Sequence, residues 1–315
     1  MNYIELKEAI LKISRDKYHY LLNIQNVVGV GFGTKQINGK NTFEPCIHVL
    51  VNKKVSSQYI HYRNCIPKTY MGIKTDVIEV GTFYAKGLTE RIRPIQGGYA
   101  VSVDGATKNT GTIGCVVTKS GIFGKKYFIL SNNHVLAGNN EFKLGSKVVQ
   151  PAAEDGGVYS KDYIGTLEDY IVINFKSAIS SPVNYMDAAI AKLNSKSLVD
   201  KHNLIAKVGS VKGVAAAIEN QKIKMVGSTT GLSEGFVATI GATTKEVIYP
   251  DGKKAFFKNQ NLAALKNAGG DSGSIILNQS NEAIGLFFAG SGPKVAIFTD
   301  MKLVLNALKV DMYLG

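Results

Sequence analysis

The sequence contains no tryptophan, only 7 prolines and 3 cysteines, and no long run of apolar residues. A membrane-spanning helix needs about 18 consecutive apolar residues, so we expect neither a membrane span nor a membrane partner. Residues 1–20 are mixed and charged, and they lack the apolar core and cleavage site of a secretory leader. The wide spacing of Cys46, Cys65 and Cys115 matches no zinc, redox or disulfide pattern. These absences predict buried thiols in a cytoplasmic protein.

Glycine is abundant, with 33 residues, and 15 tyrosines and 13 phenylalanines accompany it. Glycine-rich, aromatic chains with little proline favour strands joined by tight turns. Hydrophobic residues make up 45% and charged residues 19% of the chain, which excludes a disordered protein. At roughly 150 residues per domain, 315 residues suggest two domains.

The net charge of +13 suggests an anionic partner such as nucleic acid or an acidic protein surface. The lysines, however, are scattered in ones and twos, and no basic run is interleaved with aromatic residues. This distribution is typical of a solvated surface, so we do not expect a nucleic-acid partner.

Residues 1–96 are predicted to form a small α+β domain. Its expected elements are a helix at 3–22, a strand at 27–33, a hairpin turn at Asn38-Gly39, and strands at 46–51 and 75–80. The run Gly29-x-Gly31-x-Gly33 lies inside a strand and not at a strand-to-helix junction, so it predicts close backbone approach and not a phosphate loop.

Residues 97–315 change to short strands divided by Gly, Asn and Ser turns, a pattern that favours a β-barrel or sandwich. The expected strands are 112–117, 127–131, 187–193, 222–226, 236–240, 274–277 and 282–288. A last helix is predicted at Met301–Leu308, with Asp300 as its N-cap.

Three short segments of this region carry residues suited to covalent catalysis. His134 ends an apolar strand, Asp187 begins another, and Ser272 lies in a glycine-rich turn that leads into a third. A serine hydroxyl needs a neighbouring base, which histidine supplies, and an aspartate behind the imidazole fixes its tautomer. The turn also lets the amides of Gly270 and Ser272 converge on a developing oxyanion.

The motif Gly270-Asp271-Ser272-Gly273 resembles the nucleophile motif of chymotrypsin-fold (trypsin-like) serine peptidases, which share the chain order His, Asp, Ser. Asn133-His134 stands where that family has its base, and Asp187 where it has the third triad member. The strand at 285–290 resembles one wall of the family's primary specificity pocket. This resemblance implies that Phe288, Ala289 and Gly290 bind substrate.

The resemblance covers about residues 97–315 and implies two six-stranded antiparallel β-barrels, at about 97–196 and 197–299, with the active site between them and the C-terminal helix completing the domain to 315. A closer likeness is to the bacterial and plant branch that includes the narrow-leaf type of trypsin-like protein. It is carried by four segments, at residues 26–31, 75–81, 131–136 and 229–232. This likeness implies that the N-terminal domain belongs to the family architecture, with a regulatory or assembly role.

Three departures from the family pattern bear on specificity and activation. Val135 replaces the disulfide-forming cysteine of secreted relatives, and residue 274 is Ser where many have Gly. The segment 261–268 has no acidic residue to select Arg or Lys, and Phe287, Phe288 and Ala289 suggest an apolar pocket. Asp271 is expected to pair with a cation inside the protein, without a zymogen cut near residues 93–98.

The sequence therefore predicts a mainly β serine endopeptidase that acts through His134, Asp187 and Ser272, with a protein or peptide substrate and narrow, regulated specificity. We expect no cofactor and no metal, since His19, His48, His61 and His202 show no ligand spacing. A homo-oligomer could form through the N-terminal domain. Two alternatives are a catalytically idle chymotrypsin fold used as an interaction module, and a basic nucleic-acid-binding protein.

Overall fold

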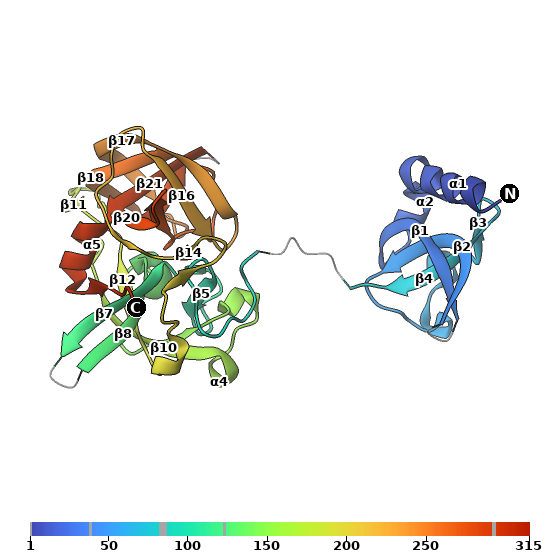
Figure 1. The fold of residues 1–315 in the computed structure, drawn as a ribbon, viewed down its shortest axis with the longest axis horizontal. Helices are drawn as coiled ribbons and strands as arrows, with labels where there is room; N and C mark the ends of the chain where they lie inside the picture. The colour runs from blue at the N-terminus through green and yellow to red at the C-terminus, as the bar shows by residue number, and fades with distance from the viewer. Residues whose placement is uncertain (1, 38–39, 82–86, 122–123, 292–293) are drawn as a thin grey trace. The chain divides into compact units, whose positions relative to one another are not determined.

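The computed structural model describes residues 2–37, 40–81, 87–121, 124–291 and 294–315. Its contacts divide the chain into two compact units, Met1–Ala85 and Lys86–Gly315 (Figure 1). The sequence predicted the division at 96/97. Residues 87–96 join the larger unit because Leu88 and Ile95 are buried in its core. Among the described residues, no helix is long and apolar enough to cross a membrane.

The smaller unit is a four-stranded sheet with two helices over one face (Figure 1). Its helices are α1 (Tyr3–Asp16) and α2 (His19–Leu22), with 3₁₀ turns η1 (Ser57–Tyr59) and η2 (Tyr62–Asn64). Its strands, in spatial order, are β1 (Val27–Ile37), β2 (Lys40–Val51), β4 (Ile73–Glu79) and β3 (Thr69–Tyr70). These elements agree with the predicted α+β organisation.

The predicted single helix at 3–22 is wrong, because α1 ends at Asp16 and a second short helix follows. Asn2 begins α1 through a reciprocal capping box with Glu5. The break after Asp16 turns the chain, so that Leu21 enters the same apolar core as Ile10. The strands of the predicted hairpin pair antiparallel as β1 and β2, while its turn residues, Asn38 and Gly39, lie outside the described residues.

The first sheet of the larger unit contains eight strands. They are β5 (Ala100–Val103), β6 (Gly111–Thr112), β7 (Cys115–Gly121), β8 (Gly124–Ser131), β9 (Lys147–Val149), β10 (Tyr163–Tyr170), β12 (Ala189–Leu193) and β22 (Asp311–Met312). β6 pairs with β5, and just beyond it the Gly114 amide donates to Leu130 on β8. Taken as one bent strand, β6 and β7 therefore close a barrel with β5, β9, β10, β12 and β8.

The second sheet closes on itself as a six-stranded antiparallel barrel. Its strands, in order around the ring, are β16 (Lys222–Gly227), β17 (Gly231–Ile248), β18 (Lys254–Ala264), β21 (Val295–Asp300), β20 (Glu282–Ser291) and β19 (Ile275–Asn278). Two short strands, β11 (Val183–Asn184) and β15 (Gly213–Val214), add to it in parallel. The two predicted barrels are therefore confirmed.

Short elements connect and close the barrels. They are α3 (Asn133–Leu136), α4 (Tyr159–Asp162), the 3₁₀ turns η3 (Ala153–Asp155) and η4 (Lys196–Leu198), and the paired strands β13 (Leu204–Ile205) and β14 (Gly209–Ser210). The predicted last helix is confirmed as α5 (Met301–Leu308), where the Asp300 carboxylate accepts from the amides of Lys302 and Leu303.

Alternation along the strands explains the runs of consecutive apolar residues at 128–130 on β8 and 275–277 on β19. On β8, Ile129 lies in the core of the first barrel, whereas Phe128 and Leu130 lie in a second core shared with the other barrel and α5. On β19, Ile276 points into the second barrel, whereas Ile275 faces the shared core. Both faces of these parts of the strands are therefore buried; His134 follows the buried end of β8, and Ser272 precedes β19.

The cysteines are free thiols, but they are not all buried as predicted. Cys46 and Cys115 are buried, whereas Cys65 is partly exposed beside the Ile60 and His61 carbonyls. Burial raises the pKa of the Cys46 thiol to about 11 and that of the Cys115 thiol to about 12. Both buried thiols are therefore protonated at neutral pH.

Candidate active site

The predicted histidine and aspartate lie side by side next to the ends of two strands of the first barrel. His134 stands in α3, directly after β8, and Asp187 lies between β11 and β12. The His134 Nδ1 atom lies 2.6 Å from Asp187 Oδ2, and the His134 backbone amide donates to Asp187 Oδ1 at 3.3 Å. Because Asp187 is only 1% exposed, this carboxylate acts on the imidazole with little screening by water.

The aspartate is held by two further residues that the sequence analysis missed. The Tyr249 hydroxyl donates to Asp187 Oδ2 at 3.0 Å, and the Asn132 side chain donates to the Asp187 carbonyl at 2.6 Å. The Tyr249 ring meets the His134 ring edge to face, with centroids 5.6 Å apart. Burial and the neighbouring Asp187 charge raise the pKa of Tyr249 well above its usual value, so its hydroxyl stays a donor at neutral pH.

Asparagines hold the main chain around His134. The Asn133 side chain donates to Asn140 Oδ1 and to the Ile171 carbonyl, and the Asn109 side chain donates to the His134 carbonyl. Asn140 has a φ of 75°, a left-handed conformation that asparagine tolerates better than most residues. These hydrogen bonds fix the main chain around His134 independently of Asp187.

Ser272 lies across a cleft from these groups, in the turn between β18 and β19. A cleft of about 1040 Å³ is lined by both His134 and Ser272, and also by Gly270, Phe288, Ala289 and Gly290. The cleft thus brings together all the predicted substrate-facing residues, while Asp187 lies buried behind His134. The histidine comes from the first barrel and the serine from the second, as expected.

The turn around Ser272 is suited to holding an oxyanion. Gly270 has a φ of 95°, and a Cβ there would lie 2.3 Å from Thr229 Oγ1, so this position requires glycine. The Gly270 carbonyl accepts from the hydroxyls of Thr112 and Ser228, which fixes the peptide. Within the described part of the chain, the amides of Gly270 and Ser272 donate to no protein acceptor. They remain available to a ligand oxygen.

Among the residues that the structure describes, Asp271 pairs with no cation, so that prediction is wrong. Its buried carboxylate accepts from the amides of Thr229, Thr230 and Ala268 and from the Thr230 hydroxyl. Four donors satisfy the charge where a cation was expected. Gly227 makes room for this arrangement, because a Cβ there would lie 2.1 Å from Asp271 Oδ1.

The predicted pocket wall is partly as expected. Phe288 lines the cleft and packs on Phe257, with ring centroids 4.8 Å apart. Phe287, by contrast, points into the core of the second barrel, because neighbouring residues of a strand face opposite ways. At the other end of the wall, a Cβ on Gly290 would lie 2.0 Å from Asn267 Oδ1, so glycine leaves space for that amide.

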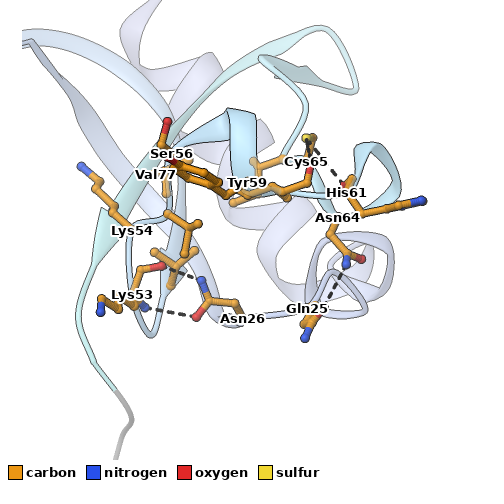
Figure 2. Close-up of a pocket in the computed structure, with 14 residues that line it drawn as sticks. Gln25, Asn26, Lys53, Lys54, Ser56, Tyr59, His61, Asn64, Cys65 and Val77 are labelled. Atoms are coloured by element: carbon orange, nitrogen blue, oxygen red, sulfur yellow. Dashed lines mark hydrogen bonds between the residues drawn. The ribbon is translucent and has the colours of Figure 1, made fainter.

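A separate cavity of about 730 Å³ lies in the smaller unit (Figure 2). Its walls include the ends of β2 and β4 and the segment 53–66. Asn26 exchanges hydrogen bonds with the backbone of Lys53, and the Asn64 side chain donates to Gln25, which joins two sides of the cavity (Figure 2). None of the predicted catalytic residues lines it.

Comparison with known proteins points to serine proteases. Residues 181–301 match the family model described as Peptidase S7, Flavivirus NS3 serine protease. Thermobifida fusca protease A is 18% identical, with a TM-score of 0.49 over 70% of this chain and 99% of that one. Cellulomonas bogoriensis chymotrypsin is 19% identical, with a TM-score of 0.46 over 70% and 99%. None of the curated proteins matches the sequence.

The matched family segment includes Asp187 and Ser272 and runs through the second barrel. The two closed barrels give the larger unit a chymotrypsin-like fold, and the matched segment is similar to a serine protease family model. The likeness to the narrow-leaf branch is not addressed by these comparisons and stays a prediction.

Proposed function

We propose that residues 86–315 form a serine endopeptidase that hydrolyses peptide bonds through an acyl-enzyme. The observation that carries the proposal is the 2.6 Å contact between His134 Nδ1 and Asp187 Oδ2, facing a cleft that Ser272 also lines. With Nδ1–H donated to the carboxylate, Nε2 is left as the base. A histidine that is to take the serine proton at neutral pH must have this nitrogen free of a proton.

In the proposed mechanism, Ser272 Oγ attacks the peptide carbonyl while His134 Nε2 takes its proton. The amides of Gly270 and Ser272 stabilise the oxyanion that forms. His134 then returns the proton to the leaving amine, and water attacks the acyl-enzyme by the same route in reverse. Asp187 keeps its charge throughout and stabilises the imidazolium.

The wall of the cleft formed by β20 supports an apolar preference next to the cleaved bond, while five carboxylates also line the cleft: Glu141, Glu154, Asp155, Glu246 and Asp251. Phe288 and Ala289 form part of its wall, and segment 261–268 supplies no acidic side chain. We therefore propose a protein or peptide substrate with narrow, regulated specificity. The three free cysteines are consistent with the proposed cytoplasmic location. Assembly of copies through the smaller unit stays a proposal.

Covalent labelling by a fluorophosphonate probe tests this function without knowledge of the substrate. The probe reacts with an activated serine beside a formed oxyanion site, so the wild-type chain should be labelled at Ser272. The Ser272→Ala variant should lose the label. A matched Ser280→Ala variant, which changes an exposed serine, should keep it. Labelling that survives in Ser272→Ala, or no labelling of the wild type, would contradict the proposal.

Replacing Tyr249 with phenylalanine should lower kcat by about 10-fold and leave KM unchanged. The ring and its packing are kept, while the hydrogen bond to Asp187 is lost, and bonds to charged groups contribute about 1.5–3 kcal/mol. Hydrolysis of a p-nitrophenyl ester measures both constants, with Tyr185→Phe, an exposed tyrosine, as the control. Equal kcat values for wild type and variant would show that the bond does not position the aspartate.

The same variant should also change the pH dependence of stability. Above about pH 10 the unfolded chain ionises this tyrosine, whereas the fold keeps it protonated because its pKa is raised. The stabilisation is therefore complete below about pH 10 and is lost as the pH rises further. Urea unfolding between pH 9 and 11 should show a steeper loss of free energy for wild type than for Tyr249→Phe.

A further inference from the structure

We propose that Cys46, His48 and Asp76 in the smaller unit bind a zinc ion. A thiol sulfur, an imidazole nitrogen and a carboxylate oxygen from these residues all lie within 4.8 Å of one another. Thiolate, imidazole and carboxylate are the ligands that zinc takes in proteins, and three protein ligands leave one position open. This site shares no residue with the proposed peptidase site.

Strand geometry brings the three side chains to one face of the sheet. Cys46 and His48 are two residues apart on β2, so they point the same way, and Asp76 lies opposite His48 in the parallel β2–β4 register. Ile47, which lies between Cys46 and His48 on β2, points to the opposite face of the sheet and belongs to the core beneath the helices. The cluster therefore stands on the helix-free face. Spacing along the sequence could not indicate this cluster, because Asp76 lies near Cys46 and His48 only through the parallel pairing of β4 with β2.

A bulge in β1 covers the cluster and orients two of its members. The register of β1 on β2 shifts between Thr34 and Gln36. The Thr34 carbonyl lies 2.9 Å from His48 Nε2, and the Gln36 amide donates to Asp76 Oδ2 at 2.7 Å. Because a carbonyl can only accept, Nε2 carries the ring proton and Nδ1 is left as the ligand atom.

This pattern of outer contacts is what metal-binding residues commonly show. A ligating histidine usually donates its other N–H to a carbonyl or carboxylate, and ligating carboxylates are themselves hydrogen-bonded. Here one bulge supplies both partners. Within the described residues, no hydrogen bond or ion pair joins Cys46, His48 and Asp76 to one another. Their ligand atoms are close together without satisfying one another.

Gly33 and Lys35 complete the surroundings. A Cβ on Gly33 would lie 2.1 Å from the His48 ring, so the glycine on β1 is what allows the ring to occupy this place. This gives a role to one residue of the Gly29-x-Gly31-x-Gly33 run. Lys35 Nζ donates to the Thr75 carbonyl at 3.3 Å, so a backbone oxygen engages the neighbouring cation. On binding, the metal would displace the Cys46 thiol proton, and the resulting thiolate and the Asp76 carboxylate would balance the charge of a divalent ion.

Cobalt(II) serves as a spectroscopic probe for the site in the full-length chain. We expect one equivalent to bind, with visible bands of a four-coordinate ion and a thiolate-to-cobalt charge-transfer band, and we expect zinc to displace it. Loss of a residue that only hydrogen-bonds to a metal ligand costs about 10–100-fold in metal affinity. Cys46→Ser removes a ligand itself, so it should weaken binding by more than about 100-fold and remove the charge-transfer band. Cys65→Ser, which changes a partly exposed thiol of the same unit, should leave both unchanged.

Asp76→Asn provides a second variant in case Cys46→Ser fails to fold, and it should keep the charge-transfer band while binding at least 10-fold more weakly. A third measurement uses only the wild type, whose melting temperature should rise with zinc and fall again with a chelator. The proposal is overturned if the wild type binds no stoichiometric cobalt. It is equally overturned if Cys46→Ser binds like the wild type, or if Cys65→Ser loses the charge-transfer band.

Discussion

Replacing Asp187 with asparagine should lower kcat by about 10⁴-fold, the loss that this change causes in other triad enzymes. Asparagine has one oxygen, whereas Asp187 Oδ2 faces His134 Nδ1 and Tyr249 while Oδ1 faces the His134 amide. If the amide nitrogen turns to Nδ1, the imidazole must carry its proton on Nε2 and cannot accept one from Ser272. If the side-chain nitrogen instead takes the place of Oδ1, it faces the His134 backbone amide, and two N–H donors oppose each other.

The measurement is ester hydrolysis by purified Asp187→Asn, with thermal unfolding as a check on folding. Asp169→Asn is a suitable control, because Asp169 lies on β10 with its side chain 52% exposed and contacts Lys119 and the Tyr170 backbone amide but no residue of the cleft. The control should hydrolyse the ester at the wild-type rate. A folded Asp187→Asn that loses less than about 10-fold in kcat would be inconsistent with the proposed role of this carboxylate.

Replacing Asp271 with asparagine should destabilise the protein by about 3–6 kcal/mol. Each Asp271 oxygen accepts two hydrogen bonds, and an amide nitrogen in place of either oxygen would face two donors. Hydrogen bonds to charged groups contribute about 1.5–3 kcal/mol each, and two would be lost. Since a domain is stable by only about 5–15 kcal/mol, this loss is a large fraction of the total stability.

Urea unfolding of Asp271→Asn and wild type measures this effect, with Asp311→Asn as the exposed control. Thr230→Val is a milder companion that removes only the hydroxyl donor, and it should cost less than the aspartate change. Both variants should also slow fluorophosphonate labelling, because the carboxylate holds the turn that carries Gly270 and Ser272. Wild-type stability in Asp271→Asn would mean that the four hydrogen bonds contribute little.

Local patterns explain which elements could be predicted. The capped helix α5 and the apolar strands β8 and β12 are recognisable because their neighbours in sequence determine them. The strands β17 and β18 are different: β17 runs for 18 residues with much of its length exposed, and only part of it was predicted. β18 was missed altogether. Pairing across the barrel, and not local hydrophobic periodicity, holds them in place.

By itself, the sequence determined the candidate residues His134, Asp187 and Ser272, because their surroundings within a few residues are distinctive. It also determined the glycine-rich turn, whose backbone angles only glycine adopts readily. The tertiary structure alone decided that Tyr249 donates to Asp187, that four uncharged donors satisfy Asp271, and that Asp76 joins Cys46 and His48. The physical reason is the same in each case. Strand pairing and packing decide which polar groups meet, and most of the groups that meet here are far apart along the chain, with Ala268 beside Asp271 as the exception.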